Sequence, residues 1–131
     1  MERMIVRYTD GRVVKGQSND FSPLRDQFHI RSLGKRDNAP VALTELKAIY
    51  YVKYWDGRPF HKEKKTFPAL GTRPGRRVVV RFADGEELFG ITQSYSPQQK
   101  GFYVYPTDPD SNNERIFVIN GPSVAEVSFP E

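Results

Sequence analysis

Apolar and polar residues alternate in two stretches of the chain, residues 3–8 and 77–82. In each stretch every second residue is apolar or aromatic, and two arginines lie among the residues between them. A period of two is typical of a β-strand that buries one face and exposes the other. Asp10-Gly11 follows the first stretch and Asp84-Gly85 the second, and Asp-Gly tolerates the positive φ angles of a type I′ turn. Both stretches are therefore predicted to begin a β-hairpin.

The two stretches belong to an internal repeat. Four separated segments superpose at one offset of 74 residues, which is too many for coincidence. Beyond residue 31 the offset drifts to 78, which requires a four-residue difference in a loop. The matching segments are 5–11 with 79–85, 15–16 with 89–90, 21–23 with 95–97, and Phe28 with Phe102. The repeat predicts two copies, residues 1–57 and 77–131, joined by a linker at 58–76.

Each copy is predicted to contain five strands. The second strand reaches a glycine, Gly16 or Gly90, where we expect a bulge or sharp bend because a side chain would collide there. One 3₁₀ turn is predicted before the fifth strand, because Gly121-Pro122 rules out a continuous helix in the second copy. The last three strands are expected at 27–31, 41–43 and 48–54 in the first copy, and at 101–105, 115–119 and 125–129 in the second.

Five short strands with a helical turn before the last resemble the small Sm-like and Src-homology-3-like barrels. The resemblance implies a mainly β protein of two tandem five-stranded barrels, in which each bent sheet closes on itself and hides its edges. A unit of about 50 residues buries little surface. The two copies are therefore expected to pack together or exchange strands, and a homodimer is a further arrangement that adds buried surface.

The composition excludes several kinds of site. The chain has no cysteine, which rules out disulfides, thiolate nucleophiles and zinc sites with cysteine ligands. The two histidines, His29 and His61, have no Ser or Asp partner at a recognisable spacing. No Gly-x-x-x-x-Gly-Lys phosphate loop follows a strand. We therefore expect a binding module rather than an enzyme, with no cofactor and no metal.

The chain is also predicted to be a cytoplasmic protein without membrane association. Its longest apolar run, residues 48–52, is far too short for a transmembrane helix. No secretory segment precedes the first predicted strand.

The net charge of +4 hides a gradient along the chain. Residues 1–57 carry ten basic and seven acidic groups, residues 58–77 seven and one, and residues 78–131 three and eight. The linker therefore holds the excess positive charge, while Phe60, Phe67 and Leu70 favour its docking over full disorder. Three interpretations remain open: a solvated connector, a clasp against the acidic second copy, or an anion site for nucleic acid, nucleotide or an acidic partner.

Arg-x-x-x-Arg occurs on the outward face of both predicted first strands and at the end of the linker. Arginines four apart on a strand stand about 13 Å from each other, too far to hold one phosphate together. A charged face that keeps the strand soluble is therefore the favoured interpretation. An anion or ligand site is the alternative, and its candidate residues are Arg58, Lys62, Lys64, Lys65, Arg73, Arg76, Arg77 and Arg81.

This arginine pattern, together with Asp20-Phe21-Ser22, resembles the PilZ barrels in part. Those barrels bind cyclic di-GMP through Arg-x-x-x-Arg before a strand and a later Asp/Asn-x-Ser-x-x-Gly. Arg25 stands where the second motif has its glycine. The resemblance implies a cyclic di-GMP receptor as an alternative function, and the basic linker implies RNA binding as another.

Two features of the second copy bear on binding. Residues 108–114 place oxygen atoms like the start of a calcium loop, but Ile119 stands where a bidentate Glu is required. This segment is therefore predicted to be a hairpin loop stabilised by Asx turns. Tyr103 and Tyr105 fall on the opposite face of their strand from Phe102. This position predicts either an exposed aromatic pair suited to stacking on bases or binding a peptide, or a pair packed between the copies or in a dimer.

The chain is similar to an uncharacterised family of bacterial domains in residues 46–53, 55–57, 101–104 and 111–118. Members of that family occur alone, in tandem or beside signalling domains. The resemblance covers both copies, implies a bacterial cytoplasmic binding or scaffolding module, and transfers no catalytic residue. We therefore predict a protein-interaction adaptor in bacterial signalling, whose partner is a protein, with nucleotide and RNA as the alternatives.

Overall fold

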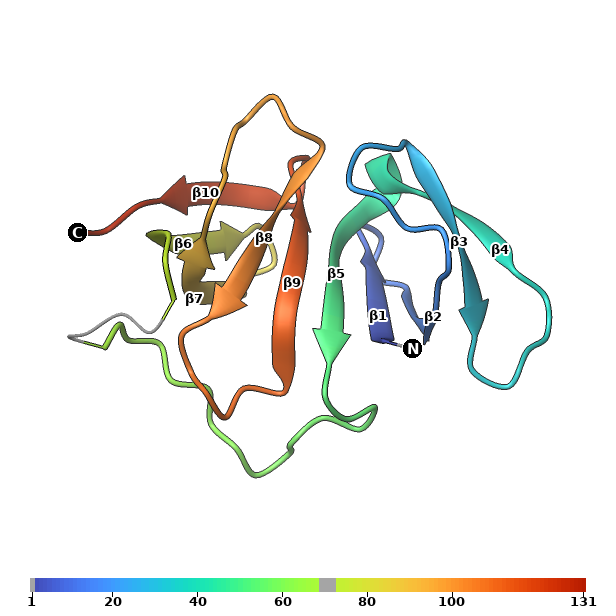
Figure 1. Ribbon diagram of the computed structural model, residues 1–131, viewed down its shortest axis with the longest axis horizontal. Coiled ribbons are helices and arrows are strands. Elements are labelled where there is room, and N and C mark those ends of the chain that lie inside the picture. The colour runs from blue at the N-terminus through green and yellow to red at the C-terminus, as the bar shows by residue number, and fades with distance from the viewer. Residues whose placement is uncertain (1, 69–72) are drawn as a thin grey trace.

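The computed structural model describes residues 2–68 and 73–131, so Leu70 lies outside the described residues. Ten strands and one 3₁₀ helix make up this part of the chain, in which no helix is long and apolar enough to span a membrane (Figure 1). The first copy contains β1 (Arg3–Tyr8), β2 (Val13–Gln17), β3 (Gln27–Ser32), β4 (Ala39–Ala42), η1 (Leu43–Glu45) and β5 (Leu46–Val52). The second contains β6 (Arg76–Phe82), β7 (Glu87–Thr92), β8 (Gly101–Pro106), β9 (Asn113–Ile119) and β10 (Val124–Ser128). The predicted strands are confirmed, with ends displaced by one or two residues.

The strands form one open antiparallel sheet in the order β10-β6-β7-β8-β9-β5-β1-β2-β3-β4. The prediction of two closed five-stranded barrels is therefore wrong. Closure of either half would require its fifth strand to pair with its own fourth strand. Instead, β5 of the first half pairs with β9 of the second, and the two lie side by side at the centre of the molecule (Figure 1).

The burial of β5 explains why the two halves merge. All seven of its residues are buried. Ile49 and Tyr51 face one hydrophobic core, whereas Ala48, Tyr50 and Val52 face another. A strand covered on both faces is shielded from water, so its backbone groups need a partner strand along each edge. β1 pairs along one edge of β5 and β9 along the other.

The two cores lie on opposite faces of the central strands, and each contains residues of both copies. Phe117 and Ile119 of β9 belong to the core of the first half. Ile5 of β1 belongs to the core of the second half. The phenylalanines predicted to fill the cores are buried, namely Phe28, Phe82, Phe102 and Phe117. Because the cores share strands, neither half buries its apolar residues without the other.

Lys47 joins β5 to the first hairpin of the second half. Its ammonium lies 2.7 Å from a carboxylate oxygen of Asp84 and 2.6 Å from one of Glu86, to which the Tyr50 hydroxyl also donates. The Lys47 side chain is almost fully buried and lies over the Phe82 ring. The hydrogen bond from Lys47 lowers the pKa of Asp84. This charged cluster reinforces the joint beside β5 with directional contacts.

Both Asp-Gly hairpins form, but their turns differ from the predicted type I′. A type I′ turn needs positive φ at both central residues, and in the described residues only glycines have positive φ, including Gly11 and Gly85. Tyr8 N–H donates to the Arg12 carbonyl, and Gly11 N–H donates to the Tyr8 carbonyl. The result is a three-residue loop with a glycine bulge. The Asp10 carboxylate stabilises it by accepting from Arg12 N–H.

The 3₁₀ turn predicted before the last strand of each copy is present only in the first copy, as η1. In the second copy, residues 120–123 form a turn in which Val124 N–H donates to the Gly121 carbonyl. An equivalent hydrogen bond, from Leu46 N–H to the Leu43 carbonyl, closes η1, so the second copy keeps the turn without forming a 3₁₀ helix.

Gly16 and Gly90 mark a close backbone approach at equivalent places in β2 and β7. A Cβ atom at Gly16 would overlap the Arg31 carbonyl, and one at Gly90 would lie 2.5 Å from the Tyr105 carbonyl oxygen. Each glycine pairs with both neighbouring strands, without a shift of register. The collision predicted from sequence is confirmed, and it arises from close packing of strands rather than from a bulge.

Gly90→Ala is expected to lower the free energy of unfolding by about 1–3 kcal/mol, because the added methyl group overlaps the Tyr105 carbonyl and overpacking costs this much. Urea unfolding followed by fluorescence of the single tryptophan, Trp55, measures the change. Gly121→Ala is the matched control, since its nearest new neighbour would lie 3.8 Å away. Equal stability of the two variants would contradict the close approach at Gly90.

Candidate functional site

The face of β8 opposite the second core presents Tyr103 and Tyr105, as the alternation of the strand predicts. Both residues are half-buried, and their ring centroids lie 6.5 Å apart. Tyr103 packs against Phe117 at 4.9 Å and lies 6.4 Å from Tyr51. Tyr103 is therefore packed against the first core, whereas Tyr105 extends away from that core.

Two equivalent loops of the two copies stand beside these rings. Phe21 anchors the first loop through edge contacts with Phe28 at 5.1 Å and Phe117 at 5.3 Å. Tyr95, its counterpart in the repeat, anchors the second loop through an edge contact with Phe102 at 4.8 Å. Each loop is thus fixed to a core by one aromatic side chain, which leaves the Ser-Pro turn that follows at the surface.

An open groove of about 480 Å³, here called the tyrosine groove, lies between the rings and the two loops. Leu24 of the first loop lines it and is 85% exposed. Lys100 of the second loop donates to Asp26 of the first at 2.7 Å, which joins the two loops. Residues of both copies, brought together by the β5–β9 joint, therefore form one concave surface.

The lining of the tyrosine groove combines aromatic and apolar side chains with amides and hydroxyls. Its polar side chains are mostly amides and hydroxyls, namely Thr92, Gln93, Ser94, Gln98 and Gln99. Among the described residues that line it there is no carboxylate and no imidazole to act as general base. Apolar and aromatic walls with a few polar groups are the usual character of a ligand-binding pocket.

The described part of the linker lies against the second copy. Arg58 donates to the carbonyl of Asp110 at 2.8 Å, and the Thr107 hydroxyl donates to the carbonyl of Thr66. Phe67 packs on Phe89 with ring centroids 5.6 Å apart, as its apolar character predicts. Phe60, in contrast, is fully exposed. These contacts agree with a linker that acts as a clasp against the second copy, which is one of the three interpretations that the sequence leaves open.

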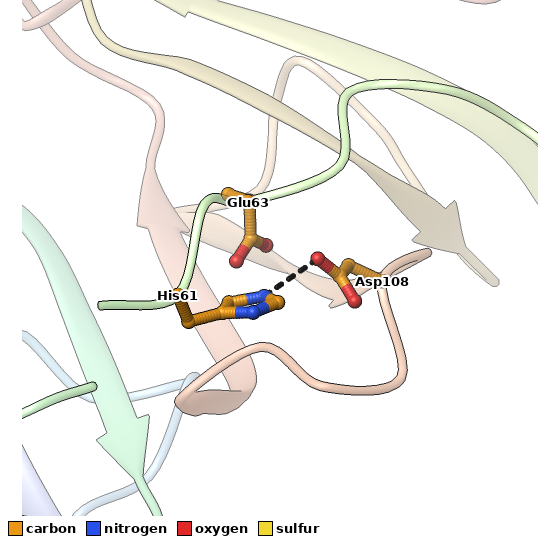
Figure 2. Close-up of side chains that lie close together, drawn as sticks. All are labelled: His61, Glu63 and Asp108. Carbon is orange, nitrogen blue, oxygen red and sulfur yellow. Dashed lines mark hydrogen bonds and ion pairs between the residues drawn. The ribbon is translucent and has the colours of Figure 1, made fainter. Parts of the chain in front are cut away.

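The clasp includes a cluster of His61, Glu63 and Asp108, whose ligand atoms all lie within 4.8 Å of one another (Figure 2). His61 Nε2 lies 2.8 Å from Asp108 Oδ2, which also accepts from Lys64 N–H. Asp110 N–H donates to the other Asp108 oxygen, which is the predicted Asx turn. Burial would raise the pKa of Asp108, but these hydrogen bonds outweigh it and lower the pKa. These three side chains could hold a metal ion.

Both histidines have an aspartate partner in the structure, at separations that form no recognisable sequence motif. His61 contacts Asp108 across 47 residues of sequence, and His29 Nδ1 lies 2.8 Å from Asp20 Oδ2 across nine. Neither separation is a recognisable motif, because the partners meet only after the strands and the linker have packed.

The eight cations predicted as an anion site are distributed among separate contacts. Arg76 and Arg77 are consecutive in β6, so their side chains lie on opposite faces of the sheet. Lys62 is exposed, and so is Lys64, whose backbone N–H contacts Asp108. The other contacts are Arg58 with the Asp110 carbonyl, Lys65 with Glu87, Arg73 with the Tyr105 ring, Arg76 with the Phe129 ring, Arg77 with the carbonyls of Pro68 and Glu131, and Arg81 with Glu126.

In the segment that resembles the second PilZ motif, residues 20–22, each side chain makes contacts within the protein. The Asp20 carboxylate accepts from both the backbone N–H and the ring of His29. Phe21 anchors the first loop, and the Ser22 hydroxyl accepts from Leu24 N–H. The backbone hydrogen bond from His29, followed by the bond from its ring, lowers the pKa of Asp20 to about 2.

Asp20 is expected to make stability depend on pH in the acid range. Its pKa is about 2 in the folded chain and near its ordinary value of about 3.9 in the unfolded chain. The contribution of Asp20 is therefore present above about pH 4 and is lost as the pH falls toward 2. Melting temperatures of the wild type and Asp20→Asn, measured from pH 5 to pH 2, should converge at the acid end. Asp56→Asn, which removes an exposed carboxylate, is the control, and parallel curves for Asp20→Asn and wild type would contradict the role of Asp20.

Strand alternation in the sequence predicts the position of the two tyrosines of the groove but not its other wall. Leu24 and Lys100 gave no signal of function, because an exposed leucine and a surface lysine are common. The repeated Ser-Pro loops were a partial signal, since they match at the offset of 74. Nothing in the sequence shows that the two loops meet.

A model of a protein family described as "Family of unknown function (DUF6982)" matches residues 1–128, a span that includes the first copy, the linker and all but the last three residues of the second copy. No curated protein and no solved structure matches the chain. The function of the tyrosine groove therefore has to be argued from its geometry.

Proposed function

The chain belongs to the DUF6982 family, and we propose that it is a non-enzymatic module that binds an extended segment of a partner protein in the tyrosine groove. Such a module would act as an adaptor in cytoplasmic signalling, the setting that the sequence resemblance implies. The proposal concerns recognition only, because the groove is lined by groups that bind rather than react.

The observation that carries this proposal is the meeting of Leu24 with Tyr103 and Tyr105 around one groove. Tyrosine offers a large rigid ring and a polar hydroxyl, which is why it is enriched where proteins bind one another. An exposed leucine beside such rings gives an apolar side chain of a partner a place to be buried. The anchored loops pre-organise the groove, which reduces the entropy lost on binding.

The chemistry of the lining favours a peptide backbone as ligand. Gln93, Gln98 and Gln99 carry amides that both donate and accept hydrogen bonds, which matches the alternating N–H and C=O groups of an extended chain. Arg73 lies over Tyr105 at 4.1 Å and is itself exposed, so it would attract an acidic residue of the ligand. We therefore expect an extended segment with an apolar side chain near an acidic one.

The contacts of the arginines favour a peptide over the dinucleotide. A cyclic dinucleotide requires cationic groups that converge on its phosphates. Arg76 lies over the Phe129 ring, whereas Arg77 donates to two backbone carbonyls. These cations are engaged with different partners, which supports the choice of a protein ligand.

A peptide library displayed on phage and selected against the wild-type chain should yield a sequence that binds with a Kd in roughly the micromolar range, about −8 kcal/mol. Leu24→Glu and Tyr105→Ala are expected to weaken its binding at least tenfold, about 1.4 kcal/mol, because each removes part of the apolar surface. Fluorescence anisotropy of the labelled peptide measures the loss.

Phe60→Glu is the matched control, since Phe60 is equally apolar and exposed but lies outside the groove. Peptides that bind Leu24→Glu and Tyr105→Ala as tightly as the wild type would contradict the proposal. Titrations with cyclic di-GMP and with short RNA at two salt concentrations test the alternatives. Saturable, salt-tolerant dinucleotide binding that Arg73→Ala abolishes would favour a dinucleotide receptor, and steeply salt-dependent RNA binding would favour the linker.

A further inference from the structure

The cluster of His61, Glu63 and Asp108 lies where the linker crosses the β8–β9 loop of the second copy (Figures 1 and 2). It is separate from the tyrosine groove, whose lining contains none of these three residues. One imidazole and two carboxylates come from these two segments. Figure 2 shows the Glu63 carboxylate above the imidazole ring and the Asp108 carboxylate at its Nε2 side. Three donor atoms of the types that first-row metal ions prefer thus surround one space.

We propose that His61, Glu63 and Asp108 form a binding site for one divalent transition-metal ion, of which Zn²⁺ is the representative. The imidazole nitrogen disfavours Mg²⁺ and Ca²⁺, which prefer oxygen ligands alone. The two carboxylates and the single imidazole suit Zn²⁺, which accepts nitrogen and oxygen ligands in a four-coordinate site. A water molecule would complete the four ligands.

The Asp108 carboxylate is already oriented by groups outside the cluster. Backbone N–H groups of Lys64 and Asp110 donate to Asp108, whose side chain is fully buried. Burial raises the pKa of Glu63, and the neighbouring Ser111, itself buried, opposes this shift. Outer partners of this kind fix the ligands of metal sites and leave their remaining lone pairs directed at the ion.

The two carboxylates of the cluster suit a divalent cation. Ionised Glu63 and Asp108 carry two negative charges, and His61 contributes at most one positive charge. Lys53, which donates to the carbonyl of Pro109, is a further cation near Glu63. A divalent ion bound to neutral His61 would replace the proton shared with Asp108 and balance both carboxylates.

The geometry allows the ion to enter with small movements. Donor atoms of a tetrahedral zinc site lie ~3.4 Å apart, from bond lengths of ~2.1 Å. The present separations run from 2.8 Å, between His61 and Asp108, to within 4.8 Å for the whole cluster. Asp108 is held rigidly, whereas the His61 side chain is 19% exposed and Glu63 lies at the surface. Rotation of these two side chains would bring the donors to zinc distances.

Isothermal titration of the untagged full chain with Zn²⁺ tests the proposal. One ion per chain is expected, with a rise in melting temperature that a chelator reverses, because the ion binds the folded state. His61→Gln should weaken Zn²⁺ binding at least about tenfold, the scale on which loss of even an outer partner acts. His29→Gln is the matched control, since His29 forms an equally short pair with Asp20 but does not belong to the cluster.

Glu63→Gln separates a metal ligand from a structural contact. This change leaves the His61–Asp108 pair in place, so the metal-free variant should melt at the wild-type temperature while its affinity for Zn²⁺ falls. Absence of Zn²⁺ binding by the wild-type chain would overturn the proposal. Retention of full affinity by both His61→Gln and Glu63→Gln, or equal loss in His29→Gln, would overturn it as well.

Discussion

The burial of β5 on both faces is the constraint on which the structure depends. A strand with two apolar faces cannot close a small barrel and leave its outer face in water. It is stable only where a second hydrophobic core covers that outer face, and the second copy supplies this core through Val78, Val80 and Ile116. Pairing of β5 with β9 follows, and it brings the loop at Leu24 beside the loop at Lys100. The tyrosine groove is therefore a product of the joint between the copies and would not exist in a single copy.

Local signals predicted the strands, because alternation and turn residues act over a few positions. The repeat then predicted five strands per copy, and both Asp-Gly hairpins and both strand glycines were found where expected. The merged sheet was not predicted, since a strand that closes its own barrel and one that joins two copies have similar local sequences. The uninterrupted apolar run at 48–52 was the available signal, because a strand with one wet face should show polar residues there.

Only those parts of the candidate sites that have a short-range signal in the sequence could be predicted. Tyr103 and Tyr105 follow from strand alternation, and the attraction of a basic linker to an acidic second copy follows from charge. The meeting of His61 with Asp108 depends on where the docked linker crosses the β8–β9 loop, which no short-range pattern encodes. Arg58 on the Asp110 carbonyl and Phe67 on Phe89 fix that path, so the position of His61 is a consequence of packing.

Differences between the copies explain why the sheet ends at β4. Pairing with Phe28 and Phe102 makes Val41 of β4 equivalent to Val118 of β9, and Pro40 equivalent to Phe117. β9 has seven residues and offers a long edge to β5, whereas β4 has four, one of them a proline without an N–H to donate. A short strand interrupted by proline is a poor template for another strand. The same position in the repeat thus joins the two halves in one copy and ends the sheet in the other.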